Sequence, residues 1–342
     1  MDVVPPCERD LVVIGASAGG VEALRSVVSG LPADFPAAVL VTMHIAAGTH
    51  SVLARILDRA GPLPARTAEH GAAIEAGTVA VAPPDRHLLI EGGSLVLTRG
   101  PTENGHRPAV NALFRAAALS AGPKAVGVVL SGVLDDGAAG LRAIVDRGGA
   151  AVVQDPADAL YGGMPESALA EVDTEYVVRA TEIGAVLGEL VRTRTGPGEE
   201  RPPPASLLLE DRIARQGVRL GAFTPTGRHG GSGYTCPDCQ GALTEVETTG
   251  QYRCRIGHAW SGPALLAAHD SEFQFALQKA LRALDEKAAL ATRLVRQAGG
   301  TRPHGLAERY AASAREAADA AETLRRFLLH TTGELGGEAV RR

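Results

Sequence analysis

Short apolar runs alternate with helical periods from Leu11 to about Leu190. Five continuous runs are rich in β-branched residues and bounded by Gly or Pro; they span residues 11–15, 38–44, 78–83, 125–132 and 150–155. Strands of this composition are buried on both faces, as in a parallel sheet covered by helices. Helical periods fill the intervals at residues 20–30, 50–60, 108–121 and 137–147. The alternation predicts an α/β fold, with a doubly wound, mainly parallel sheet and helices on both faces.

One antiparallel pair is expected beside this sheet. Residues 86–98 contain two alternating apolar runs, and Gly92-Gly93 stands between them. Two glycines at this point are typical of a tight hairpin turn.

The pattern changes after residue 191, so we expect four segments. Residues 10–191 form the α/β domain, and a linker over 192–233 is rich in Pro, Gly and charge around one short helical pattern. Three cysteines and a histidine gather in 234–262, which predicts a small zinc-ribbon-like module. Two long helical patterns in 263–332 predict an antiparallel helical hairpin.

Length, charge and hydropathy exclude several classes of protein. The chain has 342 residues, enough for more than one domain, and 45% of them are hydrophobic. A formal net charge of −5 does not favour a nucleic-acid-binding protein, which usually has a basic face. No apolar run reaches the roughly 18–20 residues of a membrane span, and the acidic N-terminus is unlike a secretory signal. We therefore expect a soluble, cytoplasmic protein with no nucleic-acid partner and no direct membrane insertion.

A candidate nucleophile follows the first predicted strand directly. Ser17 stands at the centre of Gly15-Ala-Ser-Ala-Gly19, which fits the G-x-S-x-G turn between a strand and a helix. Such a turn projects a serine hydroxyl past the sheet edge, and the next helix begins with free N–H groups, that of Ala18 first. A tight glycine turn or a phosphate-binding loop would explain the same residues. Serine at position 17 breaks the dinucleotide pattern G-x-G-x-x-G.

Candidate partners for the serine stand at the ends of two other predicted strands. Residues 38–44 end in His44, and the run from 125 leads to the pair Asp135-Asp136. Because working groups gather at the carboxyl ends of strands in open α/β sheets, a histidine base and an orienting aspartate can meet the serine there. Either aspartate can fill that role, and each could instead be a turn or helix cap. The competing bases are His50, His70, His87 and His106, which have poorer positions in the pattern.

A known family has the same motifs in the same order. They are GASAGG, HI after VTM, VAPPDRHLLI, HRPAVNALF, LSGVLDDGAAGL and QDPADALYGGMPESAL. Together they resemble the catalytic domain of the CheB chemotaxis methylesterases, from about Leu11 to Leu190. The resemblance implies a catalytic triad of Ser17, His44 and Asp136, with Asp136 rather than Asp135 as its acid. Val133 and Ala18 are then the expected backbone donors to the oxyanion.

The resemblance also implies an activity and its partners. The enzymes of this family hydrolyse methyl esters of glutamate side chains on the cytoplasmic helices of chemoreceptors, and some deamidate receptor glutamines. The expected partners are such receptor helices or related signalling proteins, and no cofactor is expected for catalysis. A receiver domain precedes the catalytic domain in the familiar chemotaxis enzyme. Here the first catalytic strand starts at residue 11, so we expect regulation by some means other than a receiver in the same chain.

Several residues depart from the usual family pattern. Ala18 stands where Thr is frequent, Met43 where Gln is frequent, and Asn111 where Asp is usual. Val133-Leu134 replaces a common Met-Gly. None of these changes removes a member of the triad, but each bears on the rate, the specificity or the oxyanion geometry. Two further hypotheses are a receptor- or partner-binding module with a vestigial site, and a hydrolase of another ester or amide.

A second chemical site is predicted near the end of the chain. Its candidate ligands are Cys236, Cys239, Cys254 and His258. Two pairs of ligands separated by a short hairpin suit tetrahedral Zn²⁺, and four protein ligands leave no open position for catalysis. We therefore expect a structural zinc ion that stabilises a segment too small for its own core. The fourth cysteine, Cys7, is expected to be a free thiol. The helical hairpin that follows suits packing, docking on a partner, or self-association.

Overall fold

The computed structural model describes residues 3–4, 8–49, 51–194, 198–199, 202–216, 231–246, 251–298 and 304–338. Cys7, His50 and residues 195–197, 200–201 and 217–230 of the predicted linker lie outside these ranges. The chain divides into two compact units, residues 1–265 and 266–342. The finer division into four segments stays a prediction.

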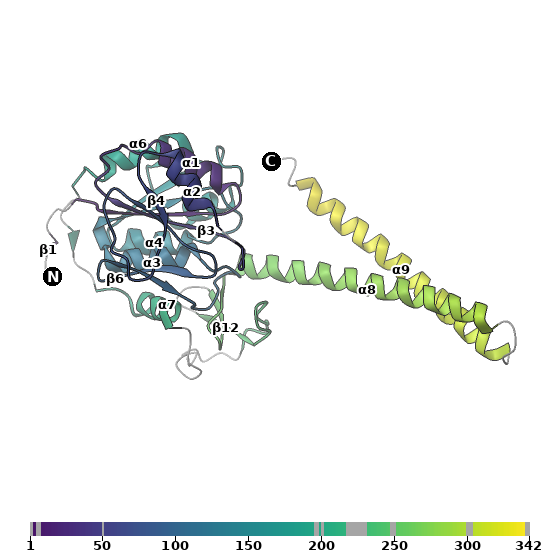
Figure 1. Cartoon of the computed structure of the whole chain (residues 1–342). Coiled ribbons are helices and arrows are strands. Elements are labelled where there is room, and N and C mark those ends of the chain that lie inside the picture. The colour runs from purple at the N-terminus through teal and green to yellow at the C-terminus, as the bar shows by residue number, and fades with distance from the viewer. Residues whose placement is uncertain are drawn as a thin grey trace. The chain divides into compact units, whose positions relative to one another are not determined.

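A seven-stranded sheet forms the centre of the first unit (Figure 1). Its spatial order is β10-β9-β8-β2-β3-β5-β4, and every neighbouring pair is parallel. The strands are β2 (Leu11–Ala16), β3 (Ala38–Met43), β4 (Ala65–Thr67), β5 (Val79–Val81), β8 (Ala125–Val129), β9 (Ala150–Gln154) and β10 (Val177–Val178). The predicted doubly wound parallel sheet is confirmed. A short antiparallel pair, β1 (Val3–Val4) with β11 (Gly198–Glu199), lies outside it.

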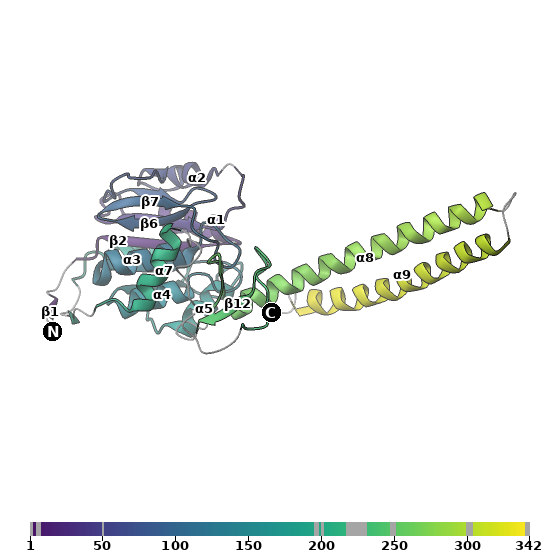
Figure 2. The same ribbon diagram turned by 90° about the horizontal axis from the view of Figure 1, so that it is seen from below.

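Helices cover both faces of the sheet, because its strands are apolar on both sides (Figures 1 and 2). Val12 and Ile14 face one core, whereas Leu11 and Val13 face the other. The first core is covered by α1 (Gly20–Ser29), α2 (Leu53–Ala60) and α6 (Ala180–Leu190). The second is covered by α3 (Val110–Ser120), α4 (Ala138–Asp146) and α5 (Gly163–Glu171), and η1 (Gly122–Lys124) leads into β8.

The predicted hairpin packs on the second core. Strands β6 (His87–Glu91) and β7 (Ser94–Thr98) pair antiparallel, and the turn between them has positive φ at Gly92 and Gly93. Helix α7 (Ala205–Gln216) lies beside β7, where the Thr98 hydroxyl donates to the Ala214 carbonyl at 2.6 Å. This helix occupies the middle of the segment predicted as a linker.

A three-stranded antiparallel sheet follows in the same unit. It consists of β12 (Leu243–Val246), β13 (Gln251–Cys254) and β14 (Ala259–Trp260). A turn at residues 236–241 precedes it, in which the Cys236 N–H donates to the Gly241 carbonyl at 2.8 Å. We call residues 234–262 the Cys3His module.

Two long helices, α8 (Gly262–Ala298) and α9 (His304–Glu338), form the helical hairpin predicted from the sequence. Phe273 packs edge to face against Phe327, with ring centroids 6.3 Å apart, and Asp285 pairs with Arg325. Over the described residues, no helix combines the length and the apolar character needed to cross a membrane.

Candidate active site

The three predicted triad residues follow three adjacent strands. Strand β2 lies between β3 and β8, and the chain runs outward from it in both directions. Ser17 follows β2, His44 follows β3, and Asp136 stands in the loop after β8. A reversal of strand order of this kind opens a crevice at the carboxyl ends of the strands. The sheet therefore brings together residues that are far apart in the sequence.

A hydroxyl, an imidazole and a carboxylate form one hydrogen-bonded series at this crevice. His44 Nδ1 lies 3.0 Å from Ser17 Oγ, and His44 Nε2 lies 2.6 Å from Asp136 Oδ2. The His44 side chain is 7% exposed and that of Asp136 is 2% exposed. Burial protects both bonds from competition with water.

Asp136 is held as a carboxylate by the start of helix α3. Its Oδ2 accepts the Val110 N–H at 2.7 Å and its Oδ1 accepts the Asn111 N–H at 2.9 Å. Burial alone would raise the pKa of Asp136, but the hydrogen bond and charge of His44, with these two N–H groups, lower that pKa to about 2. An ionised carboxylate has no proton to donate, so His44 Nε2 must be the donor between them. His44 Nδ1 is then free to accept the Ser17 proton.

Asn111 also orders the loop that carries Asp136. Its Oδ1 accepts the N–H groups of Gly137 at 3.1 Å and Gly140 at 2.7 Å, at the first turn of α4. The amide oxygen serves as a helix-capping acceptor here, as a carboxylate would. Replacement of the usual aspartate by Asn111 therefore keeps this role and leaves the negative charge with Asp136.

The turn around the nucleophile is tightly packed. Gly19 has a φ of 71°, and a Cβ there would approach Ser131 Oγ to 2.7 Å. A Cβ on Gly132 would come within 2.0 Å of Met164 Sδ and 2.9 Å of Ser17 Cβ. Met164 is completely buried. Met164, in the segment Gly162-Gly163-Met164-Pro165, thus leaves no space for a side chain at Gly132, beside Ser17.

The two backbone N–H groups expected to bind the oxyanion are those of Ala18 and Val133. Within the described part of the chain, neither the Ala18 nor the Val133 N–H is hydrogen bonded to a protein acceptor. Val133 is exposed, and Leu134 after it has a φ of 66°. A left-handed conformation is strained for a leucine, at the position where Gly is common in the family.

Asp135 points away from the triad, toward the Cys3His module. Its Oδ1 accepts the Ser261 hydroxyl at 2.9 Å and the Asn104 side-chain amide at 3.3 Å. Burial raises its pKa. Of the two adjacent aspartates, only Asp136 bonds to His44 in the structure.

Three of the histidines that compete with His44 are described, and each has different contacts. His87 is buried, and its Nε2 donates to the Pro101 carbonyl at 2.9 Å; burial lowers its pKa. His70 accepts the Leu97 N–H. His106 stacks flat on His44, with ring centroids 3.7 Å apart and an interplanar angle of 9°. Burial, and then the charge of His44, lowers the pKa of His106 to about 4. The sequence indicated His106 only as a rival base, whereas the structure places it against His44, the predicted base.

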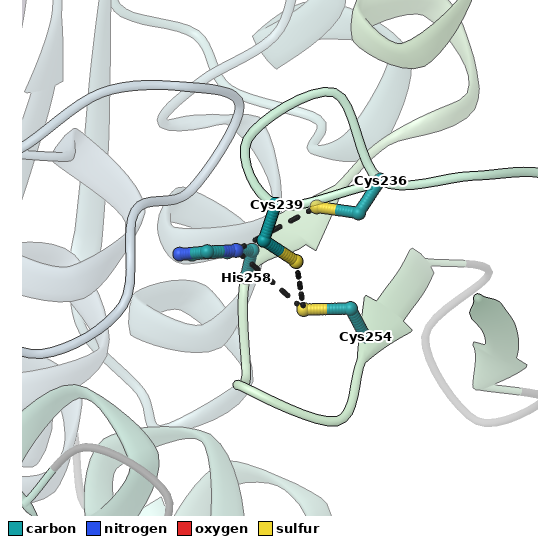
Figure 3. A group of neighbouring side chains, drawn as sticks. All are labelled: Cys236, Cys239, Cys254 and His258. Atoms are coloured by element: carbon teal, nitrogen blue, oxygen red, sulfur yellow. Dashed lines mark hydrogen bonds between the residues drawn. The ribbon is translucent and has the colours of Figure 1, made fainter. Parts of the chain in front are cut away.

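The four predicted metal ligands lie together in the Cys3His module (Figure 3). Their ligand atoms are all within 4.8 Å of one another. The sulfurs of Cys239 and Cys254 are 3.6 Å apart, and His258 Nδ1 lies 3.6 Å from Cys236 Sγ and 3.5 Å from Cys254 Sγ. Tetrahedral zinc, with Zn–S bonds near 2.3 Å, separates its ligand atoms by about 3.5–3.8 Å. The residues present therefore fit a zinc ion.

A serine, histidine and aspartate in hydrogen-bonded series on a parallel sheet define the serine-hydrolase class of site. The family model described as CheB methylesterase matches residues 12–187. The chain belongs to this family.

Similar proteins carry names of the same kind. The chain is 42% identical over 183 residues to a protein-glutamate methylesterase/protein-glutamine glutaminase of Anaeromyxobacter dehalogenans, covering 54% of each. It is 38% identical over 188 residues to the protein-glutamate methylesterase FrzG of Myxococcus xanthus, covering 55% of this chain and 56% of FrzG. The crystal structure of the Thermotoga maritima CheB methylesterase catalytic domain superposes with a TM-score of 0.52 at 33% identity, covering 54% of this chain and 100% of that one. The chain spans about half the length of the curated relatives it matches.

Proposed function

We propose that this chain is a protein-glutamate methylesterase that uses Ser17 as nucleophile, His44 as general base and Asp136 to orient the base. The observation that carries the proposal is the hydrogen-bonded series from Ser17 Oγ through both nitrogens of His44 to Asp136. Membership of the CheB methylesterase family and the names of the relatives support glutamyl methyl esters as substrates.

The geometry accounts for each proton in the reaction. As Ser17 Oγ attacks the ester carbonyl carbon, His44 Nδ1 takes the hydroxyl proton, and Asp136 stabilises the resulting imidazolium. The N–H groups of Val133 and Ala18 donate to the oxyanion of the tetrahedral intermediate. The intermediate collapses when methoxide leaves with the proton from His44, which yields methanol and an acyl-enzyme. Water then gives a proton to His44 and attacks the acyl carbon. His44 returns that proton to Ser17 Oγ as the bond from Oγ to the acyl carbon breaks, which frees the glutamate.

The same steps act on a glutamine side chain, with ammonia as the leaving group in place of methanol. The name of the Anaeromyxobacter relative includes glutaminase activity, which favours this second reaction. An amide carbonyl is a poorer electrophile than an ester carbonyl, and its nitrogen is a poorer leaving group than methoxide, so the deamidation should be the slower of the two. Ammonia release from unmethylated receptor glutamines measures it.

Methanol release from methylated receptor helices tests the main activity. Release should require Ser17, so Ser17→Ala should abolish it, together with labelling by a fluorophosphonate probe. Ser120→Ala is a matched control at the far end of α3, and it should keep both activities. If Ser17→Ala releases methanol as fast as the unaltered chain, the proposed chemistry is wrong. A chain that binds receptor but neither labels nor releases methanol would be a binding module with a vestigial site.

We further propose that Cys236, Cys239, Cys254 and His258 hold a structural zinc ion. The four ligands come from two turns, and a metal between them cross-links a module whose described residues form three short strands. Zinc would supply this cross-link and would not itself act on the ester. Elemental analysis should find about one zinc per chain, lost in Cys254→Ser. A zinc-free protein from zinc-replete cells would contradict the proposal.

The helical hairpin is the proposed site of self-association or of docking on receptor helices. Phe275 and Leu290 on α8 are 59% and 58% exposed, so pairing with α9 leaves much of their apolar surface in contact with water. Covering these side chains with a second hairpin or with a receptor helix would remove apolar surface from water. Sedimentation of the full chain, alone and with a receptor fragment, separates the two outcomes.

A further inference from the structure

The Cys3His module contacts the loop that leads to His106. The Asn104 N–H donates to the Ala259 carbonyl at 2.8 Å, and the Ala259 N–H donates to the Thr102 carbonyl at 3.1 Å. The Thr102 hydroxyl also donates to Asp238 Oδ2 at 2.8 Å, and Asp238 lies between two of the metal ligands. Residues 102–106, which we call the bridging loop, thus pair with the module like an added strand.

Ser261 joins the module to the loop that carries the catalytic aspartate. Its N–H donates to Asn104 Oδ1 at 2.8 Å, and its hydroxyl donates to Asp135 Oδ1 at 2.9 Å. The Asn104 side chain reaches the same oxygen of Asp135 at 3.3 Å. Asp135 immediately precedes Asp136, so Ser261 is hydrogen bonded to the residue next to the triad aspartate.

The bridging loop carries these contacts to the catalytic base. His106 follows Asn104 by two residues and stacks on His44. Between them, Gly105 has a φ of 75°, and a Cβ there would come within 3.3 Å of Trp260. The module therefore reaches the triad from two sides, at His44 through His106 and at Asp136 through Asp135.

A buried chain of charges holds this arrangement together. Arg253 of the module pairs with Glu210 of α7, and Arg115 of α3 pairs with Glu103 of the bridging loop. All four side chains are buried, with exposed fractions between 1% and 6%. The charges of Glu103 and Glu210 outweigh burial and raise the pKa of Arg115, so the two pairs lie within electrostatic reach of each other. Such groups resist separation, because a buried charge without its partner is costly.

From these contacts we infer that the Cys3His module is a positioning element of the active site, through which bound zinc sets how fast Ser17 reacts. Two of the ligands flank Asp238, and the other two lie either side of the turn before Ala259. A metal between them keeps Asp238, Ala259 and Ser261 in register with the bridging loop. Loss of the metal frees that loop, and His106 then no longer holds the His44 ring toward Ser17. The inference rests on the proposed zinc site, and it rests on the proposed hydrolase activity for its kinetic readout only.

Hydrogen exchange on the full chain tests the structural step without any substrate. Removal of zinc with a chelator should speed amide exchange in residues 102–106 by about tenfold or more, because the hydrogen bonds to Ala259 are lost. Exchange in residues 38–43 of β3 should not change, since that strand is in the sheet core. Equal exchange in residues 102–106 with and without zinc would overturn the inference.

Ser261 variants test the link to the nucleophile while the metal ligands stay intact. Ser261→Ala should keep its zinc but slow fluorophosphonate labelling of Ser17 by about five- to tenfold, and Ser261→Thr should restore the rate. With ester substrate the loss should fall on kcat and leave KM unchanged, and the proton resonance of the His44–Asp136 bond should shift. Ser271→Ala, the same change on an exposed serine of α8, should have no effect.

The two proposals fail in different ways. If the unaltered chain never labels at Ser17 and releases no methanol, the proposed hydrolase activity fails, and the exchange experiment still decides the positioning role. If Ser261→Ala labels at the normal rate with an unshifted resonance, the positioning role fails while the hydrolase proposal stands. If the Ser261→Ala chain loses zinc, its labelling rate no longer isolates the Ser261 contact. Hydrogen exchange in residues 102–106 of the unaltered chain then tests the positioning role.

Discussion

The imidazole rings of His106 and His44 lie face to face, with centroids 3.7 Å apart and planes 9° apart. A flat neighbour limits rotation of the His44 ring, so Nδ1 stays toward Ser17 and Nε2 toward Asp136. A charged neighbour would oppose catalysis, because His44 becomes an imidazolium in the proposed reaction. Burial and the charge of His44 lower the pKa of His106 to about 4, so His106 is neutral at physiological pH and does not repel that imidazolium.

Removal of the ring at position 106 should slow the reaction, whereas a different flat ring should not. We expect His106→Ala to lower kcat by about five- to tenfold, because an aromatic contact of this kind contributes about 0.5–1.5 kcal/mol. His106→Phe should stay within about twofold of the unaltered rate. Steady-state kinetics with methylated receptor measure both. If Phe and Ala cause equal losses, the stack has no positioning role.

The pH dependence of stability should change in His106→Phe. The unfolded chain takes up a proton at His106 below pH 6.5, but the folded chain does so only near pH 4. Stability present above pH 6.5 is therefore lost as the pH falls toward 4, by up to about 3 kcal/mol. The phenylalanine variant lacks this loss, so the stability difference between the two proteins should grow across that range. Chemical denaturation at a series of pH values measures the difference, and parallel curves would contradict the assignment.

Asp136→Asn should greatly slow catalysis without unfolding the protein. A neutral amide can donate to His44 Nε2, which would leave the proton on Nδ1, where Ser17 needs an acceptor. We expect kcat to fall on the order of 10⁴-fold. The matched change Asp135→Asn should cost less than about tenfold, because an amide oxygen still accepts from Ser261 and Asn104. Comparable losses in the two variants would place both aspartates in the relay.

Asn111 offers a test of how the aspartate loop is ordered. Asn111→Ala removes the acceptor for the buried N–H groups of Gly137 and Gly140, so we expect a loss of about 2 kcal/mol in stability and a lower kcat. Asn111→Asp keeps the acceptor and should be active and folded, although its added charge should raise the pKa of Asp136. Thermal unfolding and kinetics of both variants check this. An alanine variant as stable as the original would exclude the capping role.

The close approach of Gly132 to Met164 predicts a recoverable defect. Gly132→Ala places a methyl group against Met164 Sδ and Ser17 Cβ, so it should cost about 1–3 kcal/mol and displace the nucleophile. Adding Met164→Ala should make room for the methyl group and recover much of the Ser17 labelling rate. If the double variant labels no faster than Gly132→Ala, the collision with Met164 is not the cause.

Periodicity in the sequence predicted the long central strands well and the short edge strands poorly. The runs that became β2, β3 and β8 are continuous and apolar, because these strands are buried on both faces. The edge strands β4 and β10 have three and two residues, too few to show a period of their own. Helix α7 was expected only as a short pattern within a linker, although Glu210 anchors it to Arg253 of the module.

The sequence by itself determined which strands end in a serine, a histidine and an aspartate, and which four residues can hold a metal. Parallel strands place their carboxyl ends at one edge, so strand order along the chain suffices to bring Ser17 and His44 into one region. The residues alone left both aspartates open, the family resemblance pointed to Asp136, and the structure shows Asp136 bonded to the imidazole. Only the tertiary structure decided that His106 covers one face of that ring. Those contacts join segments that have no common periodicity, so no pattern along the chain could show them.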